Sequence, residues 1–436
     1  MQEKQNDIGL IWFRNDLRIN DNSVLNTAIK NHTSVIACYC FDPRHYQTTP
    51  FGFKKTEKFR TQFLIETVDN LKQNLGTLNI ELFVYRDTPE RVIPTLIEQF
   101  NITSIYNQNE WTSEEVQVLK NVKKAIPDHS AIIDIYNQFL YHPEELTMPF
   151  SDLPKVFTVF RKKVEKYSRV RLLETPTSAV KINSIQNNTC VPTLEDIGFT
   201  AFEPHPKTAF PFKGGETNAL NRLEDYVFNT KKVSVYKKTR NGLIGKDFSS
   251  KFSPWLANGS ISARTIYWNV KDFEKNYTKN DSTYWLIFEL IWRDYFKYVS
   301  LKHQNSIFKI GGLLNRDYEW KTNDRSIKKW INGATRSRFV NANMIELEKT
   351  GWMSNRGRQN VASFFSKELL LDWRIGAAYF ESMLIDYDVH SNYGNWMYVA
   401  GVGNDPRDRK FNVDLQADRY DSTGAFQKLW LQETLF

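Results

Sequence analysis

The sequence predicts an α/β protein: an N-terminal Rossmann-like parallel-sheet domain over residues 1–140, a long connector over 141–214 and a C-terminal all-helical domain over 215–436. Three observations predict this organisation. Short β-rich runs alternate with amphipathic stretches in the first part, prolines crowd the middle part, and β-rich runs are missing from the last part. With 436 residues, the chain is long enough for two domains with sizeable cores.

The parallel sheet is predicted from short apolar runs separated by amphipathic stretches such as 59–75 and 89–100. Strands that alternate with helices indicate right-handed crossovers and hence parallel pairing. The first run leads into "WFRNDLRINDN", so the Gly-x-Gly-x-x-Gly fingerprint of dinucleotide-binding sheets is absent. The runs are residues 8–13, 34–41, 80–85, 102–106 and 131–136.

The connector carries eight prolines between residues 143 and 211, and only residues 156–167 are expected to be helical there. A proline-rich, irregular segment of this length indicates a chain that wraps over the surface. From residue 215 onward, helical periodicity replaces the β-rich runs. This change predicts the second, all-helical domain.

The net charge of +8 is unevenly distributed. Residues 211–436 hold 34 Lys and Arg against 25 Asp and Glu, whereas residues 1–210 hold 24 against 25. The excess indicates a polyanionic partner for the helical domain, although a solvated basic surface explains it equally well.

The compartment is expected to be the cytoplasm. No apolar run approaches the ~20 residues of a membrane span, and the N-terminus lacks the basic and apolar regions of a signal peptide. The three cysteines are unclustered, which fits a reducing compartment better than a disulfide framework.

The stretch "DYDVHSNYGNWMY" (386–398) has the alternating acidic residues of a metal loop. An EF-hand loop starting at Asp386 would need Gly at its sixth position and Glu at its twelfth, but Ser391 and Met397 stand there. The scattered histidines and cysteines offer no zinc spacing. The carboxylates are therefore either solvated loop residues or face something other than a metal.

A buried helix is predicted over residues 282–300, which are apolar almost all round. Its exceptions, Glu289, Arg293 and Lys297, share one face at a spacing of four. A salt-bridge ladder explains this spacing, but such ladders belong on solvated faces. Because unmatched charges on a buried helix are costly, we favour a polar cavity behind this stripe.

Two further segments indicate a ligand site. In residues 350–365, Gly357 and Ala362 would let another group approach the backbone closely, and Asn355, Arg358, Gln359 and Ala362 share a face. In residues 247–264, hydroxyls precede a proline-initiated helix, a pattern that suits phosphate binding or ordinary N-capping. These hydroxyls belong to Ser249, Ser250 and Ser253.

Ordered motifs run along nearly the whole chain, from "LIWFRNDLRINDNSVL" to "DYDVHSNYGNWMYVAGVGNDPRDRKFN". Between them stand "FDPRHY", "LPKVFTVFRKKVE", "GGETNALNRL", "YKKTRNGLIGKDFSSKFSPWLANGSISAR" and "FELIWRDYF". Together they resemble the photolyase/cryptochrome family. "SNRGRQN" and "VAGVGNDPR" resemble its DASH branch.

The resemblance implies a U-shaped FAD in the helical domain. Arg358 and Asp386 are expected to form an ion pair beside the isoalloxazine, and Asn392 to lie next to flavin N5. The stretch 386–398 then forms a wall of the flavin site. The expected cofactor contacts are Tyr236, Ser249, Ser250, Phe252, Ser253, Arg293, Asn355, Arg358, Asp386, Asp388 and Asn392.

The resemblance also implies residues for catalysis and for the substrate. Glu289 is expected to hydrogen-bond the damaged bases and Trp292 to pack against them, with Arg356, Gln359 and Tyr398 at further substrate positions. An electron chain from the surface to the flavin is expected at Trp320, Trp373 and Trp396. For an isolated tryptophan, core packing would be the better explanation.

The implied activity is blue-light repair of cyclobutane pyrimidine dimers, preferentially in single-stranded DNA, by a monomeric photolyase. The alternative is a photoreceptor with little repair activity. A (6-4) photolyase would need a catalytic His in the dimer cavity, and His390 is a poor candidate because its segment is assigned to the flavin. A 5,10-methenyltetrahydrofolate antenna is also expected, with Glu110 as a contact.

The sequence departs from the branch at four positions. Arg336, Arg338 and Asn341 stand where relatives usually have Gly, Pro and Asp, and His390 where they often have Cys. Arg at a Gly position predicts a reshaped turn, and Asn341 is expected to cap the following helix.

Overall fold

The N-terminal domain is a five-stranded parallel sheet in the order β3-β2-β1-β4-β5. The structure, a computed structural model, describes residues 7–176, 185–316, 318–405, 408 and 410–431. Each strand lies within or overlaps one of the predicted apolar runs, so the parallel sheet is confirmed. The strands are β1 (Ile8–Trp12), β2 (Ser34–Cys40), β3 (Glu81–Tyr85), β4 (Ser104–Gln108) and β5 (Ala131–Ile135).

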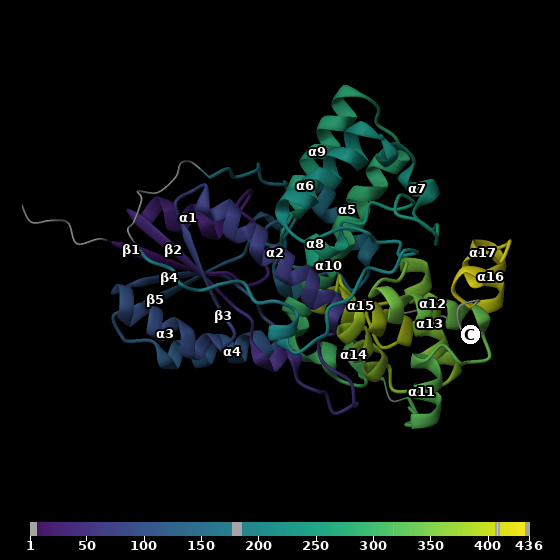
Figure 1. Cartoon of the computed structure of the whole chain (residues 1–436). Coiled ribbons are helices and arrows are strands. Elements are labelled where there is room, and N and C mark those ends of the chain that lie inside the picture. Colours follow the sequence, from purple (N-terminus) through teal and green to yellow (C-terminus); the bar gives the residue numbers. More distant parts are fainter. Residues whose placement is uncertain (1–6, 177–184, 317, 406–407, 409, 432–436) are drawn as a thin grey trace, which may run out of the picture.

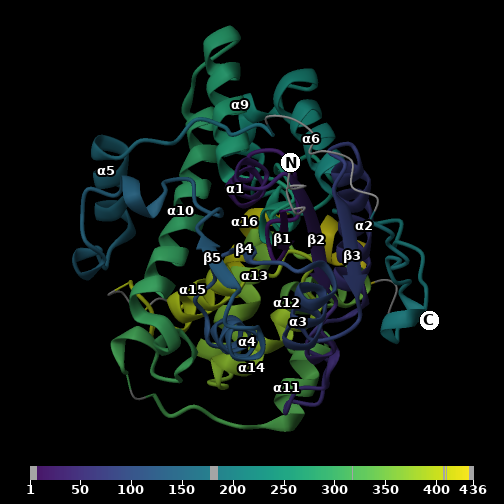
Figure 2. The same cartoon turned by 90° about the vertical axis from the view of Figure 1, so that its left-hand side faces the viewer.

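Helices cover both faces of this sheet (Figures 1 and 2). On one face, α1 (Ser23–Asn31) and α2 (Lys58–Gly76) bury Val24, Leu71 and their neighbours against the strands. On the other face, α3 (Pro89–Phe100) and α4 (Ser113–Ala125) close a second apolar layer. The resulting α/β/α sandwich is the architecture expected for a parallel sheet, whose two faces both need covering.

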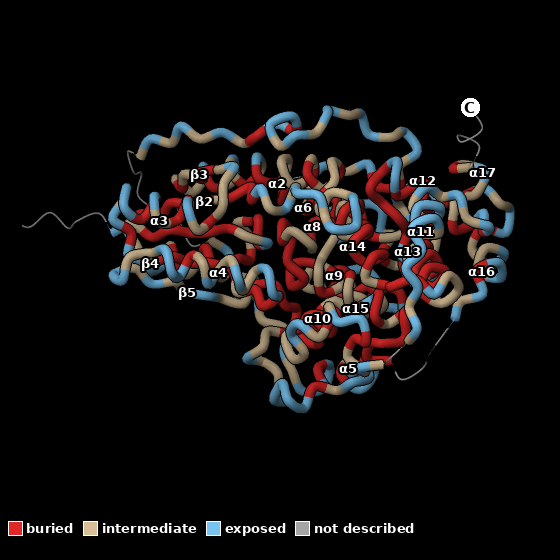
Figure 3. Tube along the Cα trace, turned by 90° about the horizontal axis from the view of Figure 1, so that it is seen from below, coloured by how far each residue is buried: buried red, intermediate tan, exposed pale blue. Residues whose placement is uncertain are grey.

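The connector is largely irregular apart from α5 (Phe157–Tyr167), as the sequence predicted. Its later part docks on the edge of the sheet, where Asn187 Nδ2 donates to the carbonyl of Leu82 and Val84 N donates to Thr189 Oγ1. Figure 3 shows a long, mostly exposed segment that crosses from the sheet domain to the helical part.

The second domain is helical, and from residue 216 to 431 the described residues contain no strand. The predicted buried helix is α10, whose start is fixed by a capping box between Asn280 and Thr283. The helices are α6 (Glu216–Glu224), α7 (Tyr236–Thr239), α8 (Ser253–Ala257), α9 (Ala263–Asn276), α10 (Asp281–His303), α11 (Asp324–Ile331), α12 (Arg338–Thr350), α13 (Asn355–Ser363), α14 (Trp373–Met383), α15 (Val389–Ala400), α16 (Val413–Tyr420) and α17 (Ala425–Leu431).

The turn before α12 differs from the expectation. Ser337, not Asn341, is the N-cap, because its side chain accepts from Val340 N. Asn341 lies inside the helix and reaches back to Thr335, whose backbone N–H and hydroxyl donate to Asn341 Oδ1. A side chain one turn into the helix thus fixes the preceding turn. None of the described helices combines the length and apolarity that crossing a bilayer would need.

Candidate cofactor and substrate site

A cavity within the helical domain, called here the inner cavity, gathers many of the predicted cofactor residues. It lies between α13, α15 and the turn that precedes α15, and its lining includes Asn355, Arg358, Gln359, Ala362, Asp386, Asp388, Asn392 and Trp396. Gly357 does not reach it, because a Cβ there would lie 1.9 Å from Asn343 Oδ1. The group that approaches Gly357 closely is therefore a neighbouring helix rather than a ligand.

The predicted ion pair between Arg358 and Asp386 is present at the wall of this cavity. Arg358 Nη2 lies 2.9 Å from Asp386 Oδ1 and donates a hydrogen bond of 3.0 Å to Oδ2. Arg358 Nε donates to the carbonyl of Met353. Oδ1 of the buried carboxylate has no hydrogen bond of good geometry, so it can accept one from a ligand.

Asp388 borders both the inner cavity and a larger one. It caps α15 by accepting from Ser391 N, and buried Lys297 lies 3.1 Å from its Oδ2. Although burial acts in the opposite direction, the charge of Lys297 helps to hold the pKa of Asp388 well below its usual range. Neither this stretch nor any other part of the described chain groups residues that would hold a metal ion.

Asn392 is held in one orientation. Its Nδ2 donates to the carbonyl of Ala377 on α14 at 3.0 Å. Since that carbonyl can only accept, the nitrogen must face Ala377, and Oδ1 is the acceptor left over. The fixed Oδ1 of Asn392 can accept a hydrogen bond from a ligand atom that gains and loses a proton.

Glu289 is partnered by a residue that the sequence analysis missed. Arg240 Nη1 donates to Glu289 Oε1 at 2.5 Å. Burial raises the pKa of Glu289, whereas Arg240 lowers it. No spacing rule could have found Arg240, because it lies on the loop after α7, 49 residues from its partner.

The predicted substrate residues make two separate sets of contacts. Phe157 of the connector stacks on Trp292 with ring centroids 3.6 Å apart, and Tyr398 meets the same indole edge-on at 6.3 Å. On α13, Arg356 Nη1 donates to Gln359 Oε1 at 2.8 Å. The ring contacts place the Trp292 indole against the connector and against α15, and the hydrogen bond joins Arg356 to Gln359 on α13.

Five of the predicted cofactor contacts line neither cavity, namely Tyr236, Ser249, Ser250, Phe252 and Ser253. Ser250, Phe252 and Tyr236 are buried, whereas Ser253 is exposed. Their loop is organised by buried Arg222, another residue that the sequence analysis missed. Its guanidinium donates to the carbonyl oxygens of Lys246, Ser249 and Ser250.

The three predicted electron-chain tryptophans occupy different depths. Trp396 borders the inner cavity and is 2% exposed, Trp373 is fully buried at the start of α14, and Trp320 is half-buried. A Cβ at Gly376 would lie 2.3 Å from the Trp396 ring, so the missing side chain lets Trp396 pack against α14, one turn from Trp373.

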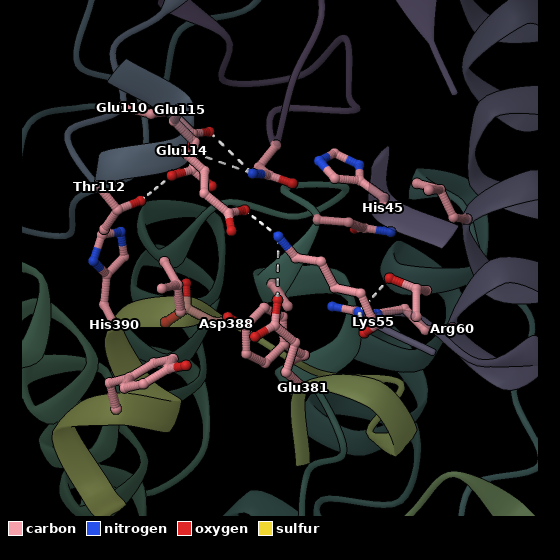
Figure 4. A pocket seen from close by; sticks show the side chains of 18 of the residues that line it. His45, Lys55, Arg60, Glu110, Thr112, Glu114, Glu115, Glu381, Asp388 and His390 are labelled. Carbon is pink, nitrogen blue, oxygen red and sulfur yellow. Dashed lines mark hydrogen bonds and ion pairs between the residues drawn. The ribbon is translucent and has the colours of Figure 1, made fainter. Parts of the chain in front are cut away.

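The larger cavity, called here the interdomain cavity, lies where the sheet domain meets the helical domain. It has a volume of about 520 Å³, within the range of ligand sites. Figure 4 shows side chains from both domains converging on it, with Glu110, Glu114 and Glu115 opposite Asp388 and His390. Arg293 lines this cavity rather than the inner one; its Nη1 donates to the carbonyl of Gln138.

Charged groups of both signs surround the interdomain cavity. Asn15 Nδ2 and Gln108 Nε2 donate to Glu110 Oε1 at 3.0 and 3.1 Å. Burial, together with the nearby charge of Glu110, raises the pKa of Glu115. Lys55 pairs with Glu114 and lies 3.8 Å from Glu381. The stripe of α10 therefore divides: Arg293 and Lys297 face this cavity, while Glu289 pairs with Arg240.

His390 belongs to the interdomain cavity, which corrects the assignment of its whole segment to the flavin wall. Its ring stacks on Trp111 with centroids 4.7 Å apart, and Nδ1 lies 2.7 Å from Ser300 Oγ. Ser300 donates its one hydrogen to the carbonyl of Lys297. Nδ1 must then be the donor, which leaves Nε2 as the acceptor. Burial holds the pKa of His390 well below its usual range.

Known proteins share both domains. The family described as FAD binding domain of DNA photolyase matches residues 285–435, and the family described as DNA photolyase matches residues 9–180. Two relatives named cryptochrome DASH, from Gloeobacter violaceus and Danio rerio, are 45% and 47% identical over 97% and 96% of this chain and 85% and 82% of their own lengths.

Solved structures agree. A Synechocystis cryptochrome has a TM-score of 0.95 and 44% identity, covering 99% of this chain and 90% of its own. A class III photolyase of Agrobacterium tumefaciens has a TM-score of 0.84 and 25% identity, covering 99% and 88%. With the arrangement of the two domains, these matches show that the chain belongs to the photolyase/cryptochrome family, among its DASH cryptochromes.

Proposed function

We propose that the protein uses FAD and blue light to split cyclobutane pyrimidine dimers, preferentially in single-stranded DNA. The observation that carries this proposal is the contact between Trp292 of α10 and Tyr398 of α15. Their rings meet edge-on with centroids 6.3 Å apart. Aromatic rings of this kind suit a pair of bases turned out of the strand.

The polar side chains of the inner cavity suit the edge of the FAD ring, and the family match covers this part of the chain. A flavin presents ring N–H and carbonyl groups. Asp386 Oδ1 is ion-paired with Arg358 but accepts no hydrogen bond of good geometry, and the Asn392 amide is fixed by Ala377. A carboxylate oxygen that can still accept a hydrogen bond and a fixed amide are suitable partners for such a ring. When bound, FAD supplies the single electron that blue light releases toward the dimer.

Glu289 would stabilise the negative charge that develops on the dimer by hydrogen bonding to its bases. Such a bond requires a proton between the carboxyl group and the base. Burial favours the protonated carboxyl, whereas Arg240 favours the carboxylate. Movement of Arg240 toward a DNA phosphate would therefore favour a protonated Glu289 when substrate binds.

The preference for single strands rests on the energetics of base flipping. Turning a dimer out of a duplex costs a few kcal/mol of unstacking and unpairing free energy. A single strand avoids most of that cost. The basic side chains of Lys237, Lys238 and Arg356 supply phosphate contacts in this proposal, so binding should weaken steeply with salt. We further propose that the protein acts as a cytoplasmic monomer.

The interdomain cavity is the proposed site of a 5,10-methenyltetrahydrofolate antenna. A pterin ring carries an amino group and a ring N–H. Carboxylates such as Glu110 and Glu115 can accept hydrogen bonds from both groups. Tyr39, Tyr46 and Tyr387 add aromatic surface to the lining. The arrangement suits a planar heterocycle with donors on one edge.

The proposal is tested with thymine-dimer oligonucleotides under blue light after chemical reduction of the flavin. The protein should repair the single strand faster than the duplex, and Glu289→Ala should lose most of the repair yield while keeping FAD. Glu90→Ala, in the sheet domain, is the control and should repair normally. Full repair by Glu289→Ala would exclude that residue. If the protein with bound FAD repairs no DNA, the photoreceptor alternative is favoured.

A further inference from the structure

A second route by which electrons could reach Trp396 passes through a residue outside the predicted chain. Among the described residues, Trp330 of α11 is the one tryptophan whose ring contacts that of Trp396, with centroids 6.3 Å apart and planes at 71°. Trp330 is fully buried. The ring contacts of Trp373 and Trp320 are instead with Tyr393 and Tyr318, respectively.

The hydrogen bonds of the indoles favour movement of positive charge away from Trp396. Nε1 of Trp396 is buried without an acceptor. Trp330 Nε1 donates to the carbonyl of Val361 at 3.2 Å, and Trp373 Nε1 to that of Ile310 at 2.9 Å. A charged donor makes a stronger hydrogen bond than a neutral one, so an oxidised indole is stabilised at Trp330 and Trp373 relative to Trp396. Two neighbours of Trp396 can therefore supply an electron to it.

The route continues from Trp330 to Tyr379 of α14. Their ring centroids are 5.8 Å apart. Tyr379 is 5% exposed. No hydrogen bond among the described residues involves its hydroxyl, and the oxygen is not one of the fully buried polar atoms without a partner, so it touches solvent. A phenol loses its proton when it is oxidised, and water at this hydroxyl can take that proton.

We propose that Trp330 and Tyr379 form a second electron route to Trp396, parallel to the one through Trp373. It rests on FAD binding as proposed above. One electron passes from Trp396 to the excited oxidised flavin, one from Trp330 to Trp396, and one from Tyr379 to Trp330. The phenolic proton of Tyr379 goes to water, leaving a neutral tyrosyl radical. An external thiol restores Tyr379 by giving one electron and one proton.

The experiment compares branch variants of the FAD-loaded protein under blue light with a thiol donor. Trp373→Phe should retain part of the photoreduction and give a tyrosyl radical signal in electron paramagnetic resonance. Adding Tyr379→Phe or Trp330→Phe to Trp373→Phe should abolish both. Tyr393→Phe, added to the same background, is the matched control and should change neither, because Tyr393 contacts Trp373 on the other branch.

FAD content and thermal unfolding of each variant separate loss of transfer from misfolding. Tyr379→Phe removes one oxygen atom, so it remains informative if Trp330→Phe fails to fold. The second route is overturned if Trp373→Phe alone abolishes photoreduction, or if Tyr379→Phe leaves the residual photoreduction and radical signal of Trp373→Phe unchanged. A failure of DNA repair would not affect these measurements, since they require only flavin and light.

Discussion

The inner cavity draws its side chains from the helical domain alone, whereas the interdomain cavity closes only where the sheet domain and the helical domain meet. In the inner cavity, Arg358 and Asp386 come from two compact motifs within one helical unit. In the interdomain cavity, Glu110 and His390 are 280 positions apart in the sequence and reach one space from different domains. Motif spacing can therefore indicate the first cavity but not the second.

The largest effect is expected in the inner cavity. Asp386→Ala would leave Arg358, whose side chain is 23% exposed, without its charged partner and should lower the free energy of unfolding by ~1.5–3 kcal/mol. FAD should be lost or loosely held on purification. Arg91→Ala breaks an exposed pair with Asp87 and should change stability by less than ~0.5 kcal/mol. Denaturant unfolding and flavin absorbance would measure both, and unchanged values for Asp386→Ala would contradict the role of the pair.

The wall shared by the two cavities should show a pH dependence. The low folded pKa of Asp388 stabilises the protein above the unfolded aspartate pKa of ~3.9. This stability is lost as pH falls below that value. In Lys297→Met the main cationic partner is gone, so burial should raise the pKa of Asp388 above its unfolded value. The carboxylate then destabilises the variant at neutral pH, and acidification relieves the penalty.

Thermal unfolding between pH 7 and pH 4 measures this effect. The difference in melting temperature between the wild type and Lys297→Met should be largest near pH 7 and should shrink toward pH 4. Lys367→Met, which breaks an ion pair with the more exposed Asp408, serves as the control. A difference that stays constant over this range would mean that the loss comes from packing rather than from charge.

The interdomain cavity can be tested without disturbing the inner one. Glu110→Gln should abolish or strongly weaken binding of 5,10-methenyltetrahydrofolate, because one acceptor of the pterin N–H groups becomes an amide. FAD content and repair by chemically reduced protein should not change. Absorption spectra after incubation with the folate would measure the binding. Equal binding by the variant would remove Glu110 from the antenna site.

The smallest effect is expected at His390. His390→Ala removes the Nε2 acceptor and the stacking on Trp111, which should weaken folate binding by ~0.5–1.5 kcal/mol. Because burial holds the pKa of His390 well below its usual range, the loss should be the same at pH 6 and pH 8. His129→Ala, a surface variant, is the control. A loss confined to one of these pH values would show that His390 titrates there.

The sequence by itself determined the features that depend on local pattern. The short apolar, β-rich runs indicated all five strands, because strands of a covered parallel sheet are rich in apolar residues, although β4 continues two residues beyond its predicted run. The stretches around Arg358 and Asp386 predicted their ion pair, since the family motifs fix their positions. The apolar surface of α10 predicted its burial, because such a surface has no stable place in water.

The tertiary structure alone decided the contacts between distant segments. Arg240 meets Glu289, Trp330 meets Trp396, and His390 stacks on Trp111 although it was expected in the flavin wall. Helix periodicity states which residues share a face but not which helix packs against that face. That choice depends on how the whole set of helices fills space around the sheet domain. The same local pattern is compatible with more than one such arrangement.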